Sequence, residues 1–225
     1  ARAMLKTEGQ TLAGMKCVVS GSGNVAEHTA RKLIQEGAVV LTLSDRTGYI
    51  WKESGLTATD IDAIIEHKDT GANLDTLKLT NTTFATGAPW QSVVAEGYFP
   101  CATQNEVSAK DATVMAESAK LVAEGANMPL SNDAIKVLHD AHIPHAPGKA
   151  SNAGGVAVSG LEMAQNASHY PWTAERVEEE LVAIMERIHT LCAKEGKETW
   201  GINYVKGANI AGAKRVLAAM EKLGW

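Results

Sequence analysis

Cysteine is scarce in this chain of 225 residues, which contains three, at Cys17, Cys101 and Cys192. They are odd in number, widely spaced and set in apolar sequence, so we expect reduced thiols rather than a disulfide framework. Long apolar runs are also absent. No stretch of the sequence approaches the ~20 apolar residues of a membrane span, and the opening ARAMLK has no apolar signal-peptide region. We therefore expect a cytoplasmic location and no membrane partner.

Positive charge is in the minority, because 21 Lys and Arg residues stand against 26 Asp and Glu residues, a formal net charge of −5 at pH 7. No basic run offsets this balance, so we do not expect nucleic acid as a partner. What the chain does have is 45% hydrophobic residues and 20 glycines. This composition fits a globular chain of one large domain or two small ones.

The most informative feature is a glycine motif between two predicted strands. An apolar run at 17–20 leads into GSGNVA at 21–26, a helical stretch follows to Glu36, and a second apolar run covers 39–43. A G-x-G-x-x-A match in this context indicates dinucleotide binding. The alternative is a glycine-rich turn in an ordinary βαβ unit.

Each small residue of the motif has a physical role. Gly21 permits a tight turn out of the strand, and Gly23 has no side chain to hold a pyrophosphate away from the main chain. Ala26 is small enough for close packing of helix against strand. The helix that begins here offers N–H groups and a partial positive charge to phosphates. The motif therefore predicts a pyrophosphate-binding loop.

The end of the second predicted strand bears on the choice of coenzyme. Asp45 lies where an acidic residue normally binds the ribose 2′-hydroxyl of NAD. Its neighbours complicate this interpretation, because Ser44 can donate a hydrogen bond to a 2′-phosphate and Arg46 can neutralise one. The alternative for Arg46 is a solvated turn residue. From the residues alone the choice stays open.

Strands and helices alternate along the chain. Apolar periodicity and capping residues predict helices at 24–36, from Thr57, after Ser108, and at 131–139, 154–166, 173–195 and 209–222. Strands are predicted at 17–20, 39–43, 82–85, before Pro100, at 121–123 and near Ile143. This order predicts an α/β fold with a Rossmann-type, doubly wound, mostly parallel sheet and a C-terminal helical segment. We place a dinucleotide-binding domain at 1–200. A C-terminal helix at 201–225 packs back on it or belongs to the link to a substrate domain.

Polar segments follow three of these strands, at 100–105, 124–129 and 147–156. Each combines small residues with an Asn or Gln side chain, which offers both a donor and an acceptor to the carboxamide and ribose of a nicotinamide nucleotide. Taken singly, each is an ordinary turn. Together we expect them to line a crevice at the carboxyl ends of the strands.

Three histidines, His139, His142 and His145, recur at every third position. Pro144 breaks any helix that would align them, so we expect surface histidines beside a strand and no metal site.

Four stretches closely resemble the cofactor domain of hexameric glutamate dehydrogenases: SGSGNVA at 20–26, PCATQNE at 100–106, AEGANMP at 123–129 and APGKASNAGGVAVSGLEM at 146–163. The resemblance runs from about Gly9 to Trp225. In this family Ser44 and Asp45, with a lysine placed like Lys68, look like the NADP(H)-preferring version. The expected cofactor is therefore NADP, with NAD as the alternative.

The motifs and the resemblance together imply a set of site residues. Those expected to bind the cofactor are Gly21, Ser22, Gly23, Asn24, Val25, Ala26, Ser44, Asp45, Arg46, Lys68, Ala102, Thr103, Gln104, Asn127 and Asn152. The resemblance further implies that Ser159 reaches the distal carboxylate of glutamate and that Val156 lines the same substrate pocket. No catalytic residue is expected in this chain.

The activity that the resemblance implies for a complete enzyme is reversible oxidative deamination of L-glutamate to 2-oxoglutarate and ammonium. Such enzymes also have an N-terminal substrate domain that carries the catalytic lysine and aspartate. We therefore expect this chain alone to bind cofactor without turnover, to meet L-glutamate or 2-oxoglutarate only with that domain, and to be monomeric or weakly associated. The alternatives are an NAD-specific glutamate dehydrogenase domain and a non-catalytic nucleotide-binding module. A leucine or phenylalanine dehydrogenase is disfavoured, because its apolar pocket does not suit polar Ser159.

Overall fold

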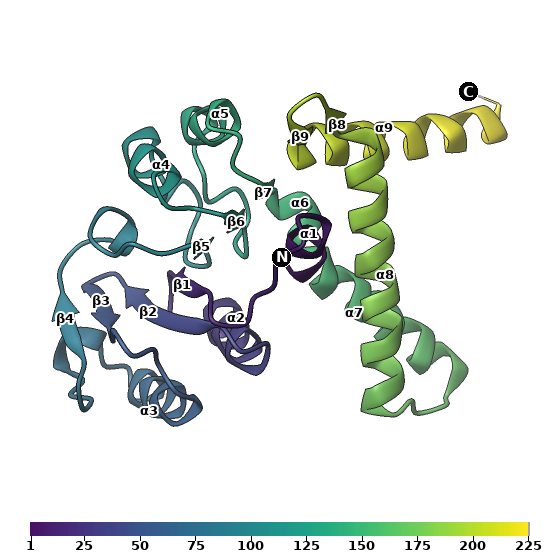
Figure 1. Ribbon diagram of the computed structural model, residues 1–225. Coiled ribbons are helices and arrows are strands. Elements are labelled where there is room, and N and C mark those ends of the chain that lie inside the picture. The colour runs from purple at the N-terminus through teal and green to yellow at the C-terminus, as the bar shows by residue number, and fades with distance from the viewer. Residues whose placement is uncertain (225) are drawn as a thin grey trace. The chain divides into compact units, whose positions relative to one another are not determined.

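The computed structural model describes residues 1–224, which divide into two compact units, one covering Ala1–His145 and one beginning at Ala146 (Figure 1). The division falls earlier than the boundary at residue 200 that the sequence suggested. In the second unit the three long helices contact one another in the order of the sequence. Residues 146–200 therefore group with the C-terminal helix.

The first unit is built on a seven-stranded sheet with the order β4-β3-β2-β1-β5-β6-β7 (Figure 1). Its centre is parallel, because β1 pairs in parallel with β2 and with β5, and β5 pairs in parallel with β6. At one edge β3 is antiparallel to β2 and β4 is antiparallel to β3. The strands are β1 Lys16–Val19, β2 Val39–Asp45, β3 Gly48–Trp51, β4 Thr83–Ala85, β5 Gly97–Phe99, β6 Leu121–Ala123 and β7 His145–Ala146.

Helices flank the sheet on both sides. In Figure 1, α2 and α3 lie together on one side and α4 and α5 together on the other. Because the strand order reverses between β1 and β5, the connections change faces there, as in a Rossmann fold. The helical elements of this unit are α1 Arg2–Thr7, α2 Asn24–Gln35, α3 Ala58–Asp69, η1 Leu74–Thr76, η2 Pro89–Gln91, α4 Ala109–Ala116 and α5 Asn132–Asp140.

Local sequence explains where these helices begin. Thr57 and Asp60 form a reciprocal capping box at α3, and Ser108 and Asp111 form another at α4. Each box satisfies two main-chain N–H groups that a helix start otherwise leaves open. The core between the sheet and α4 and α5 consists of fully buried apolar side chains, among them Val18, Trp90, Tyr98, Met115, Val122 and Leu138.

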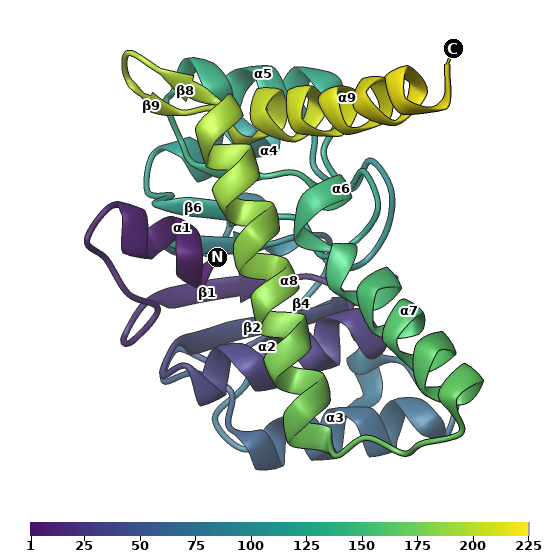
Figure 2. The same cartoon turned by 90° about the vertical axis from the view of Figure 1, so that its right-hand side faces the viewer.

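The second unit is helical. Figure 2 shows α8 as its longest helix, with α7 beside it and α9 across one end. The α8–α9 crossing depends on Gly207, since a Cβ there would collide with the Cys192 carbonyl group. Its elements are α6 Gly148–Ser151, α7 Ala153–Ser168, α8 Ala174–Glu195, the hairpin of β8 Lys197–Glu198 and β9 Gly201–Ile202, and α9 Tyr204–Leu223. Within residues 1–224 no helix is long and apolar enough to cross a membrane.

Most of the predicted helices and strands of the sequence analysis are present, including the short strand near 82–85 and the helix at 173–195. The prediction missed β3 and the β8–β9 hairpin, which are short. It also began the last helix at 209, whereas Asn203 caps α9 and accepts a hydrogen bond from the Lys206 N–H group.

The prediction of surface histidines was wrong for His145. Its side chain is 5% exposed, and its Nε2 lies 2.8 Å from Glu124 Oε1. The strand expected near Ile143 falls at His145–Ala146 instead, which carries this histidine into the sheet.

Candidate functional site

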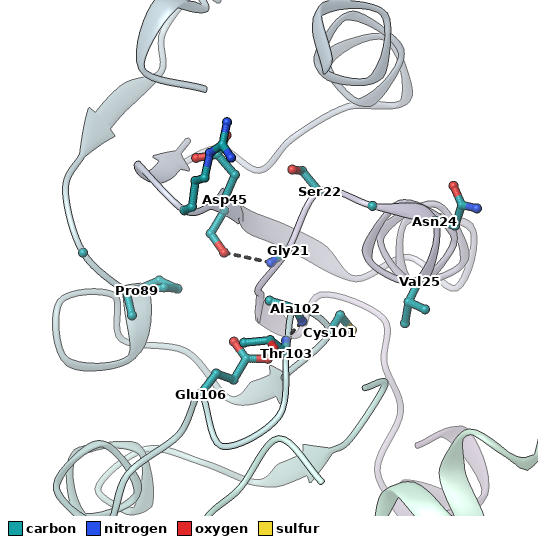
Figure 3. Close-up of a pocket in the computed structure, with 15 residues that line it drawn as sticks. Gly21, Ser22, Asn24, Val25, Asp45, Pro89, Cys101, Ala102, Thr103 and Glu106 are labelled. Carbon is teal, nitrogen blue, oxygen red and sulfur yellow. Dashed lines mark hydrogen bonds between the residues drawn. The ribbon is translucent and has the colours of Figure 1, made fainter. Parts of the chain in front are cut away.

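A pocket of about 680 Å³ lies in the first unit, where the chain leaves β1, β2 and β5 (Figure 3). Five parts of the chain line it: 21–25 after β1, 44–46 at the end of β2, 87–89 at the start of η2, 101–103 after β5, and Glu106. The two central strands, β1 and β5, are neighbours on either side of the point where the strand order reverses. Open α/β sheets bind their ligands at this point.

The glycine loop has the shape that a diphosphate needs. Gly21 has φ +85, and a Cβ on it would lie 3.1 Å from Ala102 Cα and 3.2 Å from Ala26 Cβ. Gly23 is the N-cap of α2, where no side chain caps the helix and a Cβ would meet nothing within 4 Å. The first-turn N–H groups of α2, which have no acceptor within the helix, therefore border open space.

Ser44 joins β2 to this loop. The Gly21 N–H group donates to Ser44 Oγ at 2.8 Å, and the Ser44 N–H group donates to the Gly21 carbonyl at 3.0 Å. Figure 3 shows the first of these bonds as a dashed line. Ser44 Oγ thus accepts from the loop, and its hydroxyl hydrogen still allows the donation to a phosphate that the sequence suggested.

Asp45 is the most heavily bonded side chain of the pocket. Thr47 donates to Oδ1 through its hydroxyl at 2.6 Å and its N–H at 2.9 Å. Lys68 Nζ, at 3.0 Å, and the Leu74 N–H group, at 2.9 Å, donate to Oδ2. Burial opposes ionisation of Asp45, but these hydrogen bonds outweigh it and lower its pKa to about 2. Its neighbour Arg46 is exposed and lines the pocket.

Glu106 holds the loop after β5. Its Oε1 accepts from the Ala102 N–H group at 2.9 Å and the Thr103 N–H group at 3.3 Å. Burial raises the pKa of Glu106, and the hydrogen bonds from Ser20, Ala102 and Thr103 partly offset that effect. Ser20 Oγ in turn accepts from the Cys101 N–H group at 2.9 Å. These contacts tie the end of β1 to the end of β5.

The structure brings together most of the predicted cofactor residues. The lining includes Gly21, Ser22, Gly23, Asn24, Val25, Ser44, Asp45, Arg46, Ala102 and Thr103. Ala26 is buried behind the loop, and Lys68 reaches the site through its ion pair with Asp45. Gln104 and Asn127 are exposed and are not among the lining residues.

The remaining predicted residues belong to the second unit. Asn152 is the N-cap of α7, and Val156 and Ser159 are exposed on that helix one turn apart. Within the described part of the chain no cluster of three or more His, Cys, Asp or Glu side chains could hold a metal ion.

Two parts of the pocket wall, Glu106 and the segment 87–89, were not among the predicted site residues. A signal for Glu106 was available, because it ends the PCATQNE stretch and is close enough in sequence to bond back to Ala102. The segment 87–89 lies in a weakly patterned region and carries no comparable signal.

The sheet, the flanking helices and the glycine loop at the reversal point define a Rossmann-type α/β protein. A family model described as Glutamate/Leucine/Phenylalanine/Valine dehydrogenase matches residues 1–224. The chain belongs to this family, and the resemblance to glutamate dehydrogenases is confirmed.

Curated relatives carry the names of glutamate dehydrogenases with different coenzymes. The NAD(P)-specific enzyme of Xylanibacter ruminicola is 47% identical over 98% of this chain and 51% of its own length. The NADP-specific enzyme of Escherichia coli is 46% identical over 99% of this chain and 50% of its own length. The NAD-specific enzyme of Bacteroides fragilis is 44% identical over 98% of this chain and 51% of its own length. The chain thus spans about half the length of these relatives. Their names cover both nucleotides and do not choose between them.

Solved structures agree on the fold. Glutamate dehydrogenase of Plasmodium falciparum matches with a TM-score of 0.94 and 36% identity, over 99% of this chain and 49% of that one. A hetero-hexameric glutamate dehydrogenase of Thermus thermophilus matches with a TM-score of 0.85 over 99% of this chain and 51% of that one. At 24% identity, the second match supports the fold alone.

Proposed function

We propose that this chain is the dinucleotide-binding part of a glutamate dehydrogenase. The observation that carries the proposal is the open space in front of Gly23 at the start of α2, in a loop where a Cβ on Gly21 would be crowded by Cys101, Ala102 and Ala26. Such a cradle accepts a diphosphate on main-chain N–H groups. Family membership and the relatives' names support glutamate as the substrate of the whole protein.

In this proposal the chain's residues bind and orient the coenzyme. The loop 21–26 holds the diphosphate, and Ala102, Thr103, Gln104, Asn127 and Asn152 border the riboses and the nicotinamide. Val156 and Ser159 face the substrate, and the Ser159 hydroxyl can donate to a glutamate carboxylate. The coenzyme, when bound, supplies the hydride acceptor for oxidation of L-glutamate to 2-oxoglutarate and ammonium.

We further propose that the preferred coenzyme is NADP(H). Both Asp45 oxygens already accept hydrogen bonds, and Lys68 balances the carboxylate charge, so Asp45 is poorly available to a ribose 2′-hydroxyl. Exposed Arg46 adds a cation at the pocket, which suits a 2′-phosphate. The alternative is NAD(H), held by Asp45 after the ribose displaces one of its present donors.

Fluorescence titration of the chain with NADPH and with NADH tests both proposals. We expect saturable binding of each, with NADPH bound about tenfold more tightly or better, which corresponds to ~1.4 kcal/mol. Absence of binding by either nucleotide overturns the proposed function. Equal affinities, or tighter NADH binding, overturn the coenzyme preference and leave the function standing.

The chain alone is proposed to bind coenzyme without oxidising glutamate, and to be a monomer or a weak oligomer in the cytoplasm. Glutamate oxidation above a no-enzyme control by the pure chain would contradict the first statement. Light scattering of the pure chain tests the second, and a stable hexamer would contradict it.

A further inference from the structure

We propose that Ser44 is a positioning residue that sets the conformation of the glycine loop and thereby acts on NADPH and NADH alike. The inference rests on the proposed function, because it assigns a role within the same pocket. It differs from recognition of a 2′-phosphate, in which Ser44 would act on NADPH alone.

The geometry is a reciprocal pair of hydrogen bonds to one residue. Gly21 donates its N–H to Ser44 Oγ at 2.8 Å and accepts from the Ser44 N–H at 3.0 Å, so both main-chain polar groups of Gly21 are bound by Ser44. Ser44 is 6% exposed and Gly21 is buried. In a buried setting these groups have no water to replace a lost partner.

The hydroxyl is needed because the regular strand pairing ends before the loop. The register of β1 against β2 shifts between Cys17 and Val18, and Gly21 then turns away with φ +85. The main chain of β2 therefore does not supply the acceptor for the Gly21 N–H group, and the Ser44 side chain supplies it instead.

The opposite side of the loop is already constrained. A Cβ on Gly21 would lie 3.1 Å from the Cys101 carbonyl oxygen and 3.1 Å from Ala102 Cα, so the segment after β5 blocks movement in that direction. Ser44 holds the loop from the β2 side. Loss of its hydroxyl leaves the Gly21 N–H group without its acceptor, while the bond from the Ser44 N–H group to the Gly21 carbonyl remains. The loop is then held on this side by one bond instead of two, which disturbs the N–H groups that follow Gly21.

Thr42 offers a matched control, because its hydroxyl bridges the same two strands without touching the loop. Thr42 Oγ1 accepts from the Val19 N–H group at 3.2 Å and donates to the Val19 carbonyl at 2.9 Å. Thr42 is fully buried and lies two residues before Ser44 on the same face of β2. Its replacement removes a comparable cross-strand contact and leaves Gly21 bound.

The test compares Ser44→Ala with Thr42→Val in the 225-residue chain, by urea unfolding and by titration with NADPH and with NADH. We expect Ser44→Ala to weaken both coenzymes by a similar factor of about 10, with an unchanged NADPH to NADH ratio. Thr42→Val is expected to lower stability while each Kd stays within about twofold of wild type.

Three results would overturn the inference: a loss confined to NADPH, unchanged binding by Ser44→Ala, or equal losses of binding in the two variants. The first would make Ser44 a 2′-phosphate ligand, and the last would make its role merely structural. If Ser44→Ala does not fold, Ser44→Thr and Ser44→Cys take its place. The hydroxyl of Thr should preserve both affinities, and the weaker acceptor of Cys should lower both equally. A wild-type chain that binds neither nucleotide refutes the proposed function instead.

Discussion

Asp45 Oδ2 lies 3.0 Å from Lys68 Nζ, and this ion pair joins the end of β2 to the last turn of α3. The Asp45 side chain is 7% exposed, and it also accepts from Leu74 in η1. One carboxylate thus connects three elements beside the pocket. Its ionisation is therefore coupled to the stability of the fold.

Asp45 is predicted to make stability depend on pH in the acid range. Its pKa is about 2 in the folded chain against an ordinary value of 3.8, so its contribution is complete above about pH 4 and is lost as the pH falls towards 2. The shift corresponds to roughly 2 kcal/mol. Urea unfolding should show Asp45→Asn to be less stable than wild type at neutral pH, with the difference shrinking by pH 3.

Asp75→Asn is the control, because this carboxylate is exposed in the neighbouring η1. It should follow the wild-type pH dependence. An Asp45→Asn difference that stays constant from neutral pH to about pH 3 would contradict the role assigned to the carboxylate.

Arg46 is predicted to act on NADPH alone. Removal of an exposed guanidinium beside a 2′-phosphate should raise the Kd for NADPH about tenfold and leave that for NADH unchanged. The loss should diminish as salt concentration rises, because salt screens the same attraction in the wild type. Titrations of Arg46→Ala at low and high salt measure this, with exposed Lys110→Ala as the charge-matched control. Equal losses for both coenzymes would count against the NADP(H) assignment.

Glu106 is predicted to affect stability in the opposite sense from Asp45. Burial raises its pKa, so folding favours the protonated form, and stability is lost as the pH rises through the folded pKa. Glu106→Gln stays neutral and keeps a carbonyl for the Ala102 N–H group. Relative to wild type, its free energy of unfolding should therefore increase as the pH rises above the ordinary value of 4.5.

Glu96→Gln provides a control of opposite sign. A hydrogen bond from Lys120 lowers the pKa of Glu96, so this variant should lose stability relative to wild type as the pH rises from about 3 to 6. If Glu106→Gln and wild type follow parallel pH profiles, Glu106 carries no ionisation cost in the folded chain.

The sequence predicted those parts of the structure that short-range patterns specify. The residues of the glycine motif are close together in the sequence, and so are those of the capping box at Thr57. The helix after Ser108 was predicted too, although its capping box with Asp111 was not. The antiparallel edge was predicted only in part. Its outer strand β4 was expected at 82–85, whereas β3 was missed, because it is only four residues long and pairs on one side with β2 across a short turn and on the other with β4, more than thirty residues away.

The site shows the same division between local and distant contacts. The places of the glycine loop and of Asp45 in the site could be predicted from their spacing in the sequence. The contacts of Ser44 with Gly21 and of Ser20 with Cys101 could not, because these partners are 23 and 81 residues away. A hydroxyl at the end of a strand suits a phosphate or a main-chain N–H group equally well in sequence. The packing of β1 beside β2 and β5 shows the main-chain N–H groups from which these two hydroxyls accept.

The most direct test of the central claim is coenzyme titration of Gly23→Ser. Serine is a favoured N-cap, so its side chain should bond the first-turn N–H groups of α2, and stability should stay at or above wild type. The same bonds would compete with a diphosphate, so both NADPH and NADH should bind at least about tenfold more weakly. Wild-type affinity for both coenzymes in a folded Gly23→Ser chain would contradict the claim that this loop holds the diphosphate.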